Sequence, residues 1–208
     1  KVKDEIIIED SAQALGALKN PISNAQTWSF YPAKILGCKG DAGAVTTNDF
    51  RVYEYIKEAR NHFKTDNRDF GINSRMDNLQ AALLNVKIQH IDEILSRRKE
   101  IAEIYRDAFM DAELSVGFLP KISPPAFIEG RVWQDYIINV FDKRDELYDF
   151  LKKEGVETMK NEYPWTPDYP KLPLAAKYEA ETLRIPNNEN LTDEEVNYVI
   201  EKINAFFL

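Results

Sequence analysis

Several features that mark other classes of protein are scarce in this sequence. Its 208 residues hold one cysteine, Cys38, so no internal disulfide can form and we expect a reducing, cytoplasmic location. No apolar run approaches the roughly 20 residues that span a bilayer, so we expect no membrane partner. Two histidines without acidic or thiol neighbours at ligand spacing predict no metal site. The formal net charge is -8 with no basic run, which disfavours a nucleic acid as partner.

What is present is the composition of a globular protein, with 44% hydrophobic and 30% charged residues. Apolar runs punctuated by glycine in residues 1–110 predict part of an α/β sheet domain that ends in a long connecting helix. Residues 111–208 predict a small C-terminal α+β domain. We therefore expect two domains, with the boundary near the end of the long helix.

The first apolar run lies close to the start of the chain. Residues 5–9, which contain Ile6, Ile7 and Ile8, read as a short strand buried on both faces, as in parallel sheets. Such a strand needs neighbouring strands and covering helices. We expect these to come from sequence before Lys1, and we expect residues 1–208 alone to be inactive.

Turn and capping residues predict the other elements. Strands are expected at residues 27–30, 42–47 and 132–141, and helices at about 49–60 and 142–153. A polar, irregular loop is expected over residues 61–73, and a proline-rich loop over 163–173.

Two capping boxes predict further helix starts. Ser74-x-x-Asp77 opens the long helix, and Thr192-x-x-Glu195 opens the last helix. Within the long helix, the basic run over residues 97–99 is most simply a solvated face.

Residues suited to chemistry gather in three neighbouring segments. Asp10 ends the first apolar strand, and strand ends of this kind face the ligand crevice in open α/β sheets. Lys34 has aromatic and aliphatic neighbours, and an amine in an apolar setting is more nucleophilic. Ser29 can donate to a phosphate, and Asn73 stands at the entrance to the long helix. A lone lysine or strand-end acid is more often a surface or turn residue, so the residues themselves support a ligand crevice and no more.

These segments resemble the signature blocks of the DegT/DnrJ/EryC1/StrS family of pyridoxal-phosphate (PLP) sugar aminotransferases. The acid block is EDSAQALGA (residues 9–17), the lysine block SFYPAKILG (29–37) with GDAGA (40–44), and the helix-entrance block GINSRMDNLQAA (71–82). The blocks stand in the family's order, and the resemblance covers nearly the whole chain. It implies a fold-type I PLP-dependent transferase, of which this chain is the C-terminal part.

The resemblance also implies roles for single residues. Lys34 resembles the lysine that forms a Schiff base with PLP and shuttles protons, and Asp10 resembles the partner of the pyridinium nitrogen. Gln13 resembles the residue near the ring hydroxyl of the cofactor, and Ser29 a ligand of its phosphate. Asn73 resembles the residue that reaches the phosphate of the neighbouring subunit's cofactor, which implies a homodimer with shared active sites.

The implied activity is transfer of an amino group from an amino acid, L-glutamate by the resemblance, to a nucleotide-linked keto sugar. A cyclitol or other ring ketone is an alternative acceptor. A PLP sugar dehydratase is a second alternative, which Lys34 argues against because that branch carries histidine there. A non-catalytic binding or regulatory protein is a third. The sequence departs from the family at Phe63, where a glycine is common, and near Tyr163-Pro164, where a histidine is missing.

Overall fold

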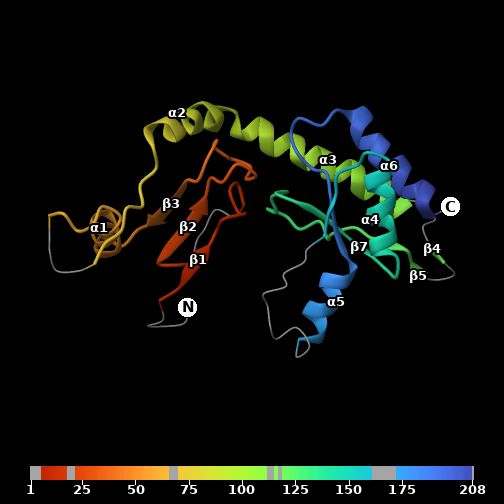
Figure 1. Cartoon of the computed structure of the whole chain (residues 1–208), viewed down its shortest axis with the longest axis horizontal. Coiled ribbons are helices and arrows are strands. Elements are labelled where there is room, and N and C mark those ends of the chain that lie inside the picture. Colours follow the sequence, from red (N-terminus) through yellow and green to blue (C-terminus); the bar gives the residue numbers. More distant parts are fainter. Residues whose placement is uncertain are drawn as a thin grey trace. The chain divides into compact units, whose positions relative to one another are not determined.

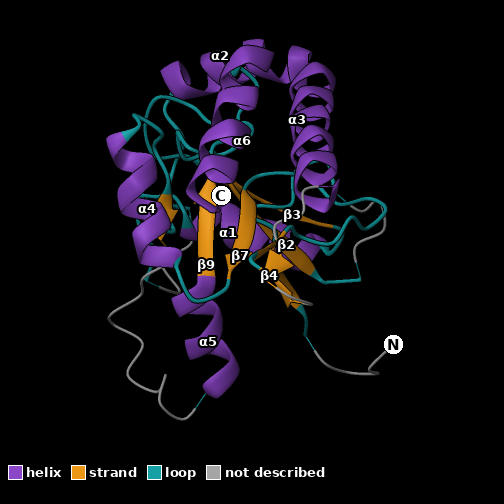
Figure 2. Ribbon diagram, turned by 90° about the vertical axis from the view of Figure 1, so that its right-hand side faces the viewer, coloured by secondary structure: helices purple, strands orange, loops and turns teal. Residues whose placement is uncertain are grey.

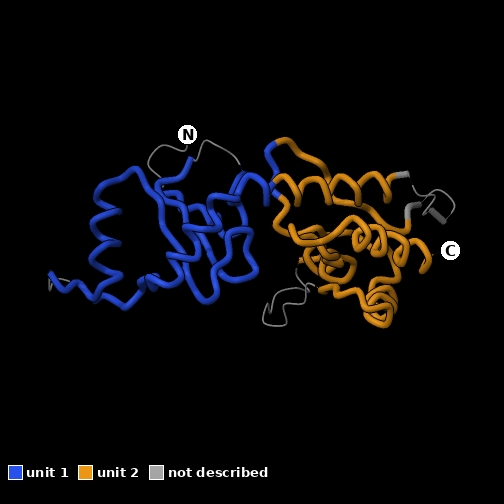
Figure 3. The backbone as a smooth tube through the Cα atoms, turned by 90° about the horizontal axis from the view of Figure 1, so that it is seen from above, with its two compact units in different colours: residues 1–95, 130–132 blue, residues 96–129, 133–208 orange. Residues whose placement is uncertain are grey.

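The structure is a computed structural model that describes residues 6–17, 22–65, 70–111, 115–116, 119–160 and 172–207. The chain divides into two compact units, residues 1–95 with 130–132 and residues 96–129 with 133–208 (Figure 3). This division concerns packing alone. The assignment of residues 1–110 to a cofactor-binding domain and of 111–208 to a small domain stays a prediction.

The first unit contains a three-stranded sheet followed by helices (Figure 1). Its elements in chain order are β1 (Ile8–Asp10), β2 (Ala25–Ser29), β3 (Gly43–Thr47), α1 (Phe50–Ala59), α2 (Asn78–Lys87), the 3-10 turn η1 (Ile88–His90) and the start of α3 (Ile91–Asp111). The strand order is β1-β2-β3, with β1 parallel and β3 antiparallel to β2. The strands predicted at 27–30 and 42–47 and the helix predicted at 49–60 are confirmed, to within two residues at each end.

The described residues do not bury the first strand, and the expectation that further strands and helices cover it stays a prediction. The Ile6 and Ile8 side chains are 82% and 66% exposed. In the described sheet β1 is an edge strand, and β2 is the strand with which it pairs.

The two predicted starts of helices in this unit have different outcomes. Asp49 caps α1 as expected, since its carboxylate accepts a backbone N–H of the first turn. The capping box at Ser74 is wrong, because α2 begins at Asn78 and Asp77, which precedes it, makes no capping hydrogen bond through its side chain. The Ser74 N–H instead donates to the Arg60 carbonyl at 3.0 Å, so this segment pairs with the end of α1.

The second unit is an antiparallel sheet with helices (Figure 2). Its elements are the rest of α3, β4 (Ser115–Val116), β5 (Leu119–Pro120), β6 (Ile122–Ser123), β7 (Tyr136–Val140), α4 (Arg144–Lys153), β8 (Met159–Lys160), α5 (Pro173–Glu181), β9 (Thr182–Ile185) and α6 (Asp193–Phe207). The four-stranded sheet has the order β6-β7-β9-β8 with every neighbouring pair antiparallel, and β4 pairs with β5. Of the strand predicted over 132–141, the second half forms as β7, and the helix predicted over 142–153 is confirmed as α4, which begins two residues later.

The capping box at the start of α6 is confirmed. The Glu195 N–H donates to the Thr192 hydroxyl at 3.2 Å, and the Thr192 N–H donates to the Glu195 carboxylate at 2.9 Å. Most of the predicted proline-rich loop, including Tyr163 and Trp165, lies outside the described residues.

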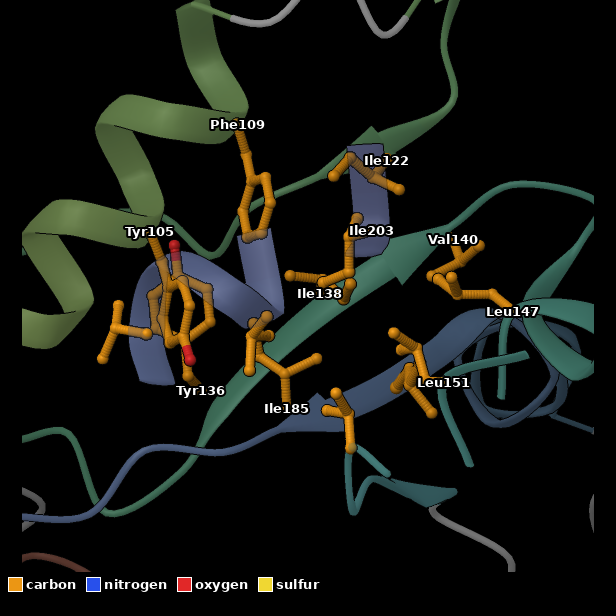
Figure 4. Close-up of a cluster of buried hydrophobic side chains, with 14 of the residues drawn as sticks. Tyr105, Phe109, Ile122, Tyr136, Ile138, Val140, Leu147, Leu151, Ile185 and Ile203 are labelled. Atoms are coloured by element: carbon orange, nitrogen blue, oxygen red, sulfur yellow. The ribbon is translucent and has the colours of Figure 1, made fainter. Parts of the chain in front are cut away.

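One hydrophobic core joins α3, the four-stranded sheet, α4 and α6 (Figure 4). Fully buried side chains from all of these elements meet in it, among them Ile101, Tyr105, Tyr136, Ile138, Leu147, Leu151 and Ile203. The Tyr105 hydroxyl donates to the Pro186 carbonyl at 2.9 Å, and burial raises the pKa of this phenol. Burial of this much apolar surface is the main stabilising term of the unit.

The prediction of a solvated face for the basic run in α3 fails at Arg98. Arg98 is buried, and its Nε donates to the Glu189 carboxylate at 2.9 Å. Its Nη1 contacts the carbonyls of Trp133, Gln134 and Asn187 at 3.4, 3.1 and 2.8 Å. The sequence prediction fails because the carboxylate and carbonyls that solvate this cation lie far away in the sequence.

We expect Arg98→Ala to lower the free energy of unfolding by about 3–5 kcal/mol, because it removes a donor from a partly buried carboxylate and from three carbonyls. Lys99→Ala is the matched control: this neighbour is exposed and pairs with Glu103 at 3.7 Å, so its loss should cost about 0.5 kcal/mol or less. Urea denaturation of the whole gene product, followed by circular dichroism, measures both. Equal losses would contradict a stabilising role for the buried arginine.

Candidate active site

The strands β1 and β2 run in parallel (Figure 1), so the last residue of each lies at the same edge of the sheet. Asp10 is the last residue of β1 and Ser29 the last of β2, and the carboxyl ends of parallel strands meet at the same edge. The exposed Asp10 carboxylate accepts the Ala12 N–H at 3.1 Å, and the Ser29 hydroxyl accepts the Tyr31 N–H at 3.3 Å. The Asp10 carboxylate can accept further hydrogen bonds, and the Ser29 hydroxyl can still donate one to a ligand.

Lys34 lies in the loop that connects β2 to β3. Its backbone N–H donates to the Tyr31 carbonyl at 2.8 Å, which closes a turn. Phe30 ties the two ends of the loop together: its N–H donates to Ala42 at 2.8 Å and its carbonyl accepts the Cys38 N–H at 2.9 Å. Lys34 is half-buried, and within the described residues its ammonium has no hydrogen bond or ion pair. The amine is therefore available for a ligand.

One face of α2 holds the segment that follows Lys34. Gln80, Leu84 and Lys87 are spaced by four and three residues and so share this face, which we call the α2 clamp. The Gln80 side chain accepts the Lys39 N–H at 2.9 Å, and the Lys87 ammonium donates to the Gly37 carbonyl at 2.9 Å. Leu84 is buried against the loop, where it forms a small core with Leu36 and Cys38.

Glycine is required at one of two positions in this loop. A Cβ on Gly37 would overlap the carbonyl group of Pro32, which cannot move without opening the turn that carries Lys34. A Cβ on Gly40 would instead meet the end of the flexible Gln80 side chain, at 3.3 Å. The backbone path after Lys34 therefore depends on Gly37 and tolerates a side chain at residue 40.

Gln13 and Asn73 occupy different surroundings. Gln13 is exposed in the turn after β1, three residues after Asp10. Asn73 forms an isolated β-bridge with Asn61 and lines a hollow of about 790 Å³ between β3, α1 and residues 73–76. Asp10, Gln13, Ser29 and Lys34 are not among the residues that line this hollow. The structure thus puts Asp10 and Ser29 at the ends of paired strands, with Lys34 in the turn that follows Ser29, and puts Asn73 at a hollow that none of the three lines.

The departure at residue 63 has a structural consequence. His62 and Phe63 have φ of 64° and 48°, in the left-handed region that costs most residues about 1–3 kcal/mol. The Phe63 ring is buried and makes an edge contact with Tyr55, with ring centroids 5.4 Å apart. The backbone is therefore left-handed at a residue other than glycine, and the side chain of that residue is packed in the fold.

Other candidate chemistry is limited in the described ranges. Cys38 is buried and its thiol contacts the carbonyls of Phe30 and Gly40, both at 2.9 Å. Within those ranges no group of three or more His, Cys, Asp or Glu side chains could hold a metal ion. The helices of the described chain are too short or too polar to cross a bilayer.

Sequence reasoning missed four residues that shape these regions: Gln80, Lys87, Asn61 and Arg75. Gln80 and Lys87 have helical spacing around Leu84 in the sequence. This spacing points to a binding face only when the position of the loop after Lys34 is known. Asn61 and Arg75 carry no such signal, because a bridge between distant segments brings them together.

Comparisons with known proteins agree on one family. The model of the DegT/DnrJ/EryC1/StrS aminotransferase family matches residues 2–204. The pleiotropic regulatory protein of Geobacillus stearothermophilus is 37% identical over 97% of this chain. The dTDP-3-amino-3,6-dideoxy-alpha-D-galactopyranose transaminase of Aneurinibacillus thermoaerophilus is 32% identical over 96% of it. The chain spans 58% of the length of each of these two relatives.

The fold agrees with a solved structure as well. The ntda protein of Bacillus subtilis, with bound cofactor PMP, superposes with a TM-score of 0.84 and 27% identity, over 97% of this chain and 50% of that one.

We expect Gly37→Ala to lower the free energy of unfolding by about 1–3 kcal/mol, because the new methyl group forces the backbone around Pro32 to shift. Gly40→Ala is the matched control and should cost less than about 1 kcal/mol, since Gln80 can move aside. Denaturation measures stability, and amide hydrogen exchange locates the change. Faster exchange confined to other parts of the Gly37→Ala variant would contradict this account of the loop.

Proposed function

This chain belongs to the DegT/DnrJ/EryC1/StrS aminotransferase family, and we propose that the protein carrying it moves an amino group from L-glutamate to a nucleotide-linked keto sugar. The observation that carries the proposal is the parallel pairing of β1 and β2, which brings Asp10 and Ser29 to one sheet edge just before the Lys34 turn. The Aneurinibacillus relative is named for an amino sugar linked to dTDP, which supports a substrate of that class. A cytoplasmic location is part of the proposal.

The residues at this edge fit PLP. The Lys34 amine, which has no partner among the described side chains, would hold the cofactor covalently. The Asp10 carboxylate accepts one backbone N–H and so has room for the ring nitrogen. Ser29 would donate to the phosphate, and Gln13 would contact the ring hydroxyl. When bound, PLP draws electrons from the carbon that carries the amino group and so makes its proton easier to remove.

The chain's own residues have distinct tasks in this scheme. Asp10 keeps a negative charge beside the ring nitrogen, which favours the protonated ring. Lys34, once its amine is free, would remove a proton from the carbon that carries the amino group and return it to the carbon on the other side of the transferred nitrogen. Ser29 orients the phosphate. The turn around Tyr31 and the α2 clamp hold Lys34 at a constant position while it does so.

A test of the function begins with the whole gene product loaded with PLP. Addition of L-glutamate should convert the cofactor to its pyridoxamine form, which is followed by absorbance. A panel of nucleotide-linked keto sugars, with a cyclitol ketone as the alternative acceptor, should then reverse the change. The regulatory name of the Geobacillus relative keeps a non-catalytic role in view. Cofactor bound at Lys34 that no donor or acceptor converts would favour that role.

We expect borohydride reduction of the PLP-loaded gene product to attach the cofactor to Lys34. Peptide mapping should find the label on the peptide that contains Lys34, and Lys34→Ala should carry no label and lose about 100-fold or more in turnover. Lys39→Ala is the control, since this exposed lysine uses its backbone to contact Gln80. A label on Lys39 would remove Lys34 from its role.

We also propose a homodimer in which Asn73 serves the partner's site. The support is that Asn73 lines a hollow to which Lys34 does not contribute. Mixed dimers of Lys34→Ala and Asn73→Ala subunits should regain part of the lost activity, because one hybrid site carries both lesions and the other carries neither. Mass spectrometry must establish subunit exchange. Exchange without recovery would assign Asn73 to its own subunit's site.

A further inference from the structure

Three cationic side chains line the hollow that Asn73 also lines. Lys57 and Arg60 come from the end of α1, and Arg75 comes from the segment before α2. Among the residues that line the hollow, Asp41 is the one acid. The lining therefore has an excess of positive charge, although the whole chain carries a formal charge of -8.

Arg75 is held without being neutralised. Its Nε donates to the Asn73 side-chain carbonyl at 2.9 Å and its Nη1 to the Asn61 side-chain carbonyl at 2.8 Å. Both acceptors are neutral amides, and the β-bridge between Asn61 and Asn73 keeps them together. Two N–H donors of the guanidinium are thus used to fix its orientation, and the rest remain for another acceptor.

The other two cations are also weakly compensated. Arg60 has no ion pair within the described chain, although its carbonyl accepts the Ser74 N–H and so ties the end of α1 to the Arg75 segment. Lys57 has a long contact to Glu54, at 3.4 Å, in an exposed pair. Screening by water makes such pairs worth little.

Arg51, on the same helix as Lys57, is an example of a cation whose charge is neutralised by a carboxylate. Arg51, in the first turn of α1, contacts the Asp49 carboxylate at 2.8 Å. Hydrogen bonds from the Arg51 side chain and backbone lower the pKa of Asp49 to about 2, so this carboxylate stays charged at neutral pH. Arg51 is not among the residues lining the hollow. It serves as a control of equal charge on the same helix.

We propose that this hollow binds the diphosphate of a nucleotide-linked ligand, with Arg75, Arg60 and Lys57 as its cations and Asn61 as the positioning residue of Arg75. A guanidinium fork matches the geometry of phosphate oxygens, and its hydrogen bonds to an anion are strong. Three cations suit a multiply charged diphosphate better than a single carboxylate. The volume lies within the roughly 300–1,000 Å³ of small-molecule sites. The assignment to a nucleotide-linked ligand rests on the proposed function.

The same phosphate chemistry has a second source, the phosphate of a cofactor, which Asn73 is proposed to contact. The two sources separate by experiment. A diphosphate site governs the affinity for nucleotides and the KM for the sugar substrate. A cofactor-phosphate site governs PLP content and the rate of the reaction with L-glutamate, in which no nucleotide takes part.

Asn61→Asp is the most informative variant. It keeps the size of the side chain and an oxygen for Arg75, so a merely structural role predicts unchanged stability and unchanged binding. It also adds a negative charge that compensates Arg75. We expect calorimetric titration of the whole gene product with UDP, dTDP, GDP and inorganic pyrophosphate to show affinity weakened roughly 10-fold or more, with an unchanged unfolding midpoint.

Arg60→Gln gives a second route that leaves the Asn61–Arg75 contact intact. We expect the same loss of affinity and a raised KM for the nucleotide-linked sugar, with PLP content and the L-glutamate reaction at the level of the unmodified protein. Arg51→Gln should change none of these quantities.

Unchanged affinity for all four probes in both Asn61→Asp and Arg60→Gln would overturn the proposal. Loss of PLP content with nucleotide affinity intact would also overturn it and assign the hollow to the cofactor's phosphate. A failure of the proposed function looks different: the unmodified protein would not react with L-glutamate. The pyrophosphate titrations would still test the hollow in that case.

Discussion

The contact between α2 and the loop after Lys34 is the constraint on which the proposed chemistry depends. The loop has little regular structure of its own, and its turn is closed by a few backbone hydrogen bonds. The α2 clamp adds a polar contact at each end, to Gly37 and Lys39, with buried Leu84 between them. Polar contacts set the register and apolar burial supplies the stability. A lysine that must move protons needs such a constant position.

Arginine illustrates how neighbours decide what a residue does in this chain. Arg98 is buried and its charge is neutralised by the Glu189 carboxylate. These contacts hold α3 against the 187–189 segment. Arg75 is exposed and held by two neutral amides, which fix its direction and leave its charge intact. The first arrangement stabilises the fold, because removal of the cation strands a partly buried acid. The second is suited to binding, because the charge is still available to an anion.

Predictions from sequence succeeded where the cause is local and failed where it is not. The box at Thr192 formed because its partners lie three residues apart. The similar pattern at Ser74 did not form, because that segment pairs with the end of α1 through contacts that a local pattern does not report. The strings around Asp10 and Lys34 identified the family, since a motif lies in one stretch of chain. The contact of Lys87 with Gly37 spans 50 residues and needed the fold.

The helix α2 joins the two regions that the sequence treats as separate motifs. It begins three residues after Arg75 and contacts the Lys34 loop along its length, over ten residues or about 15 Å. A helix of this length does not bend easily, so the segment that carries Asn73 and the loop that carries Lys34 are both attached to one rigid element. If Asn73 contributes to the partner's site and Lys34 to its own subunit's site, each α2 keeps one residue of each site at a fixed distance from the other.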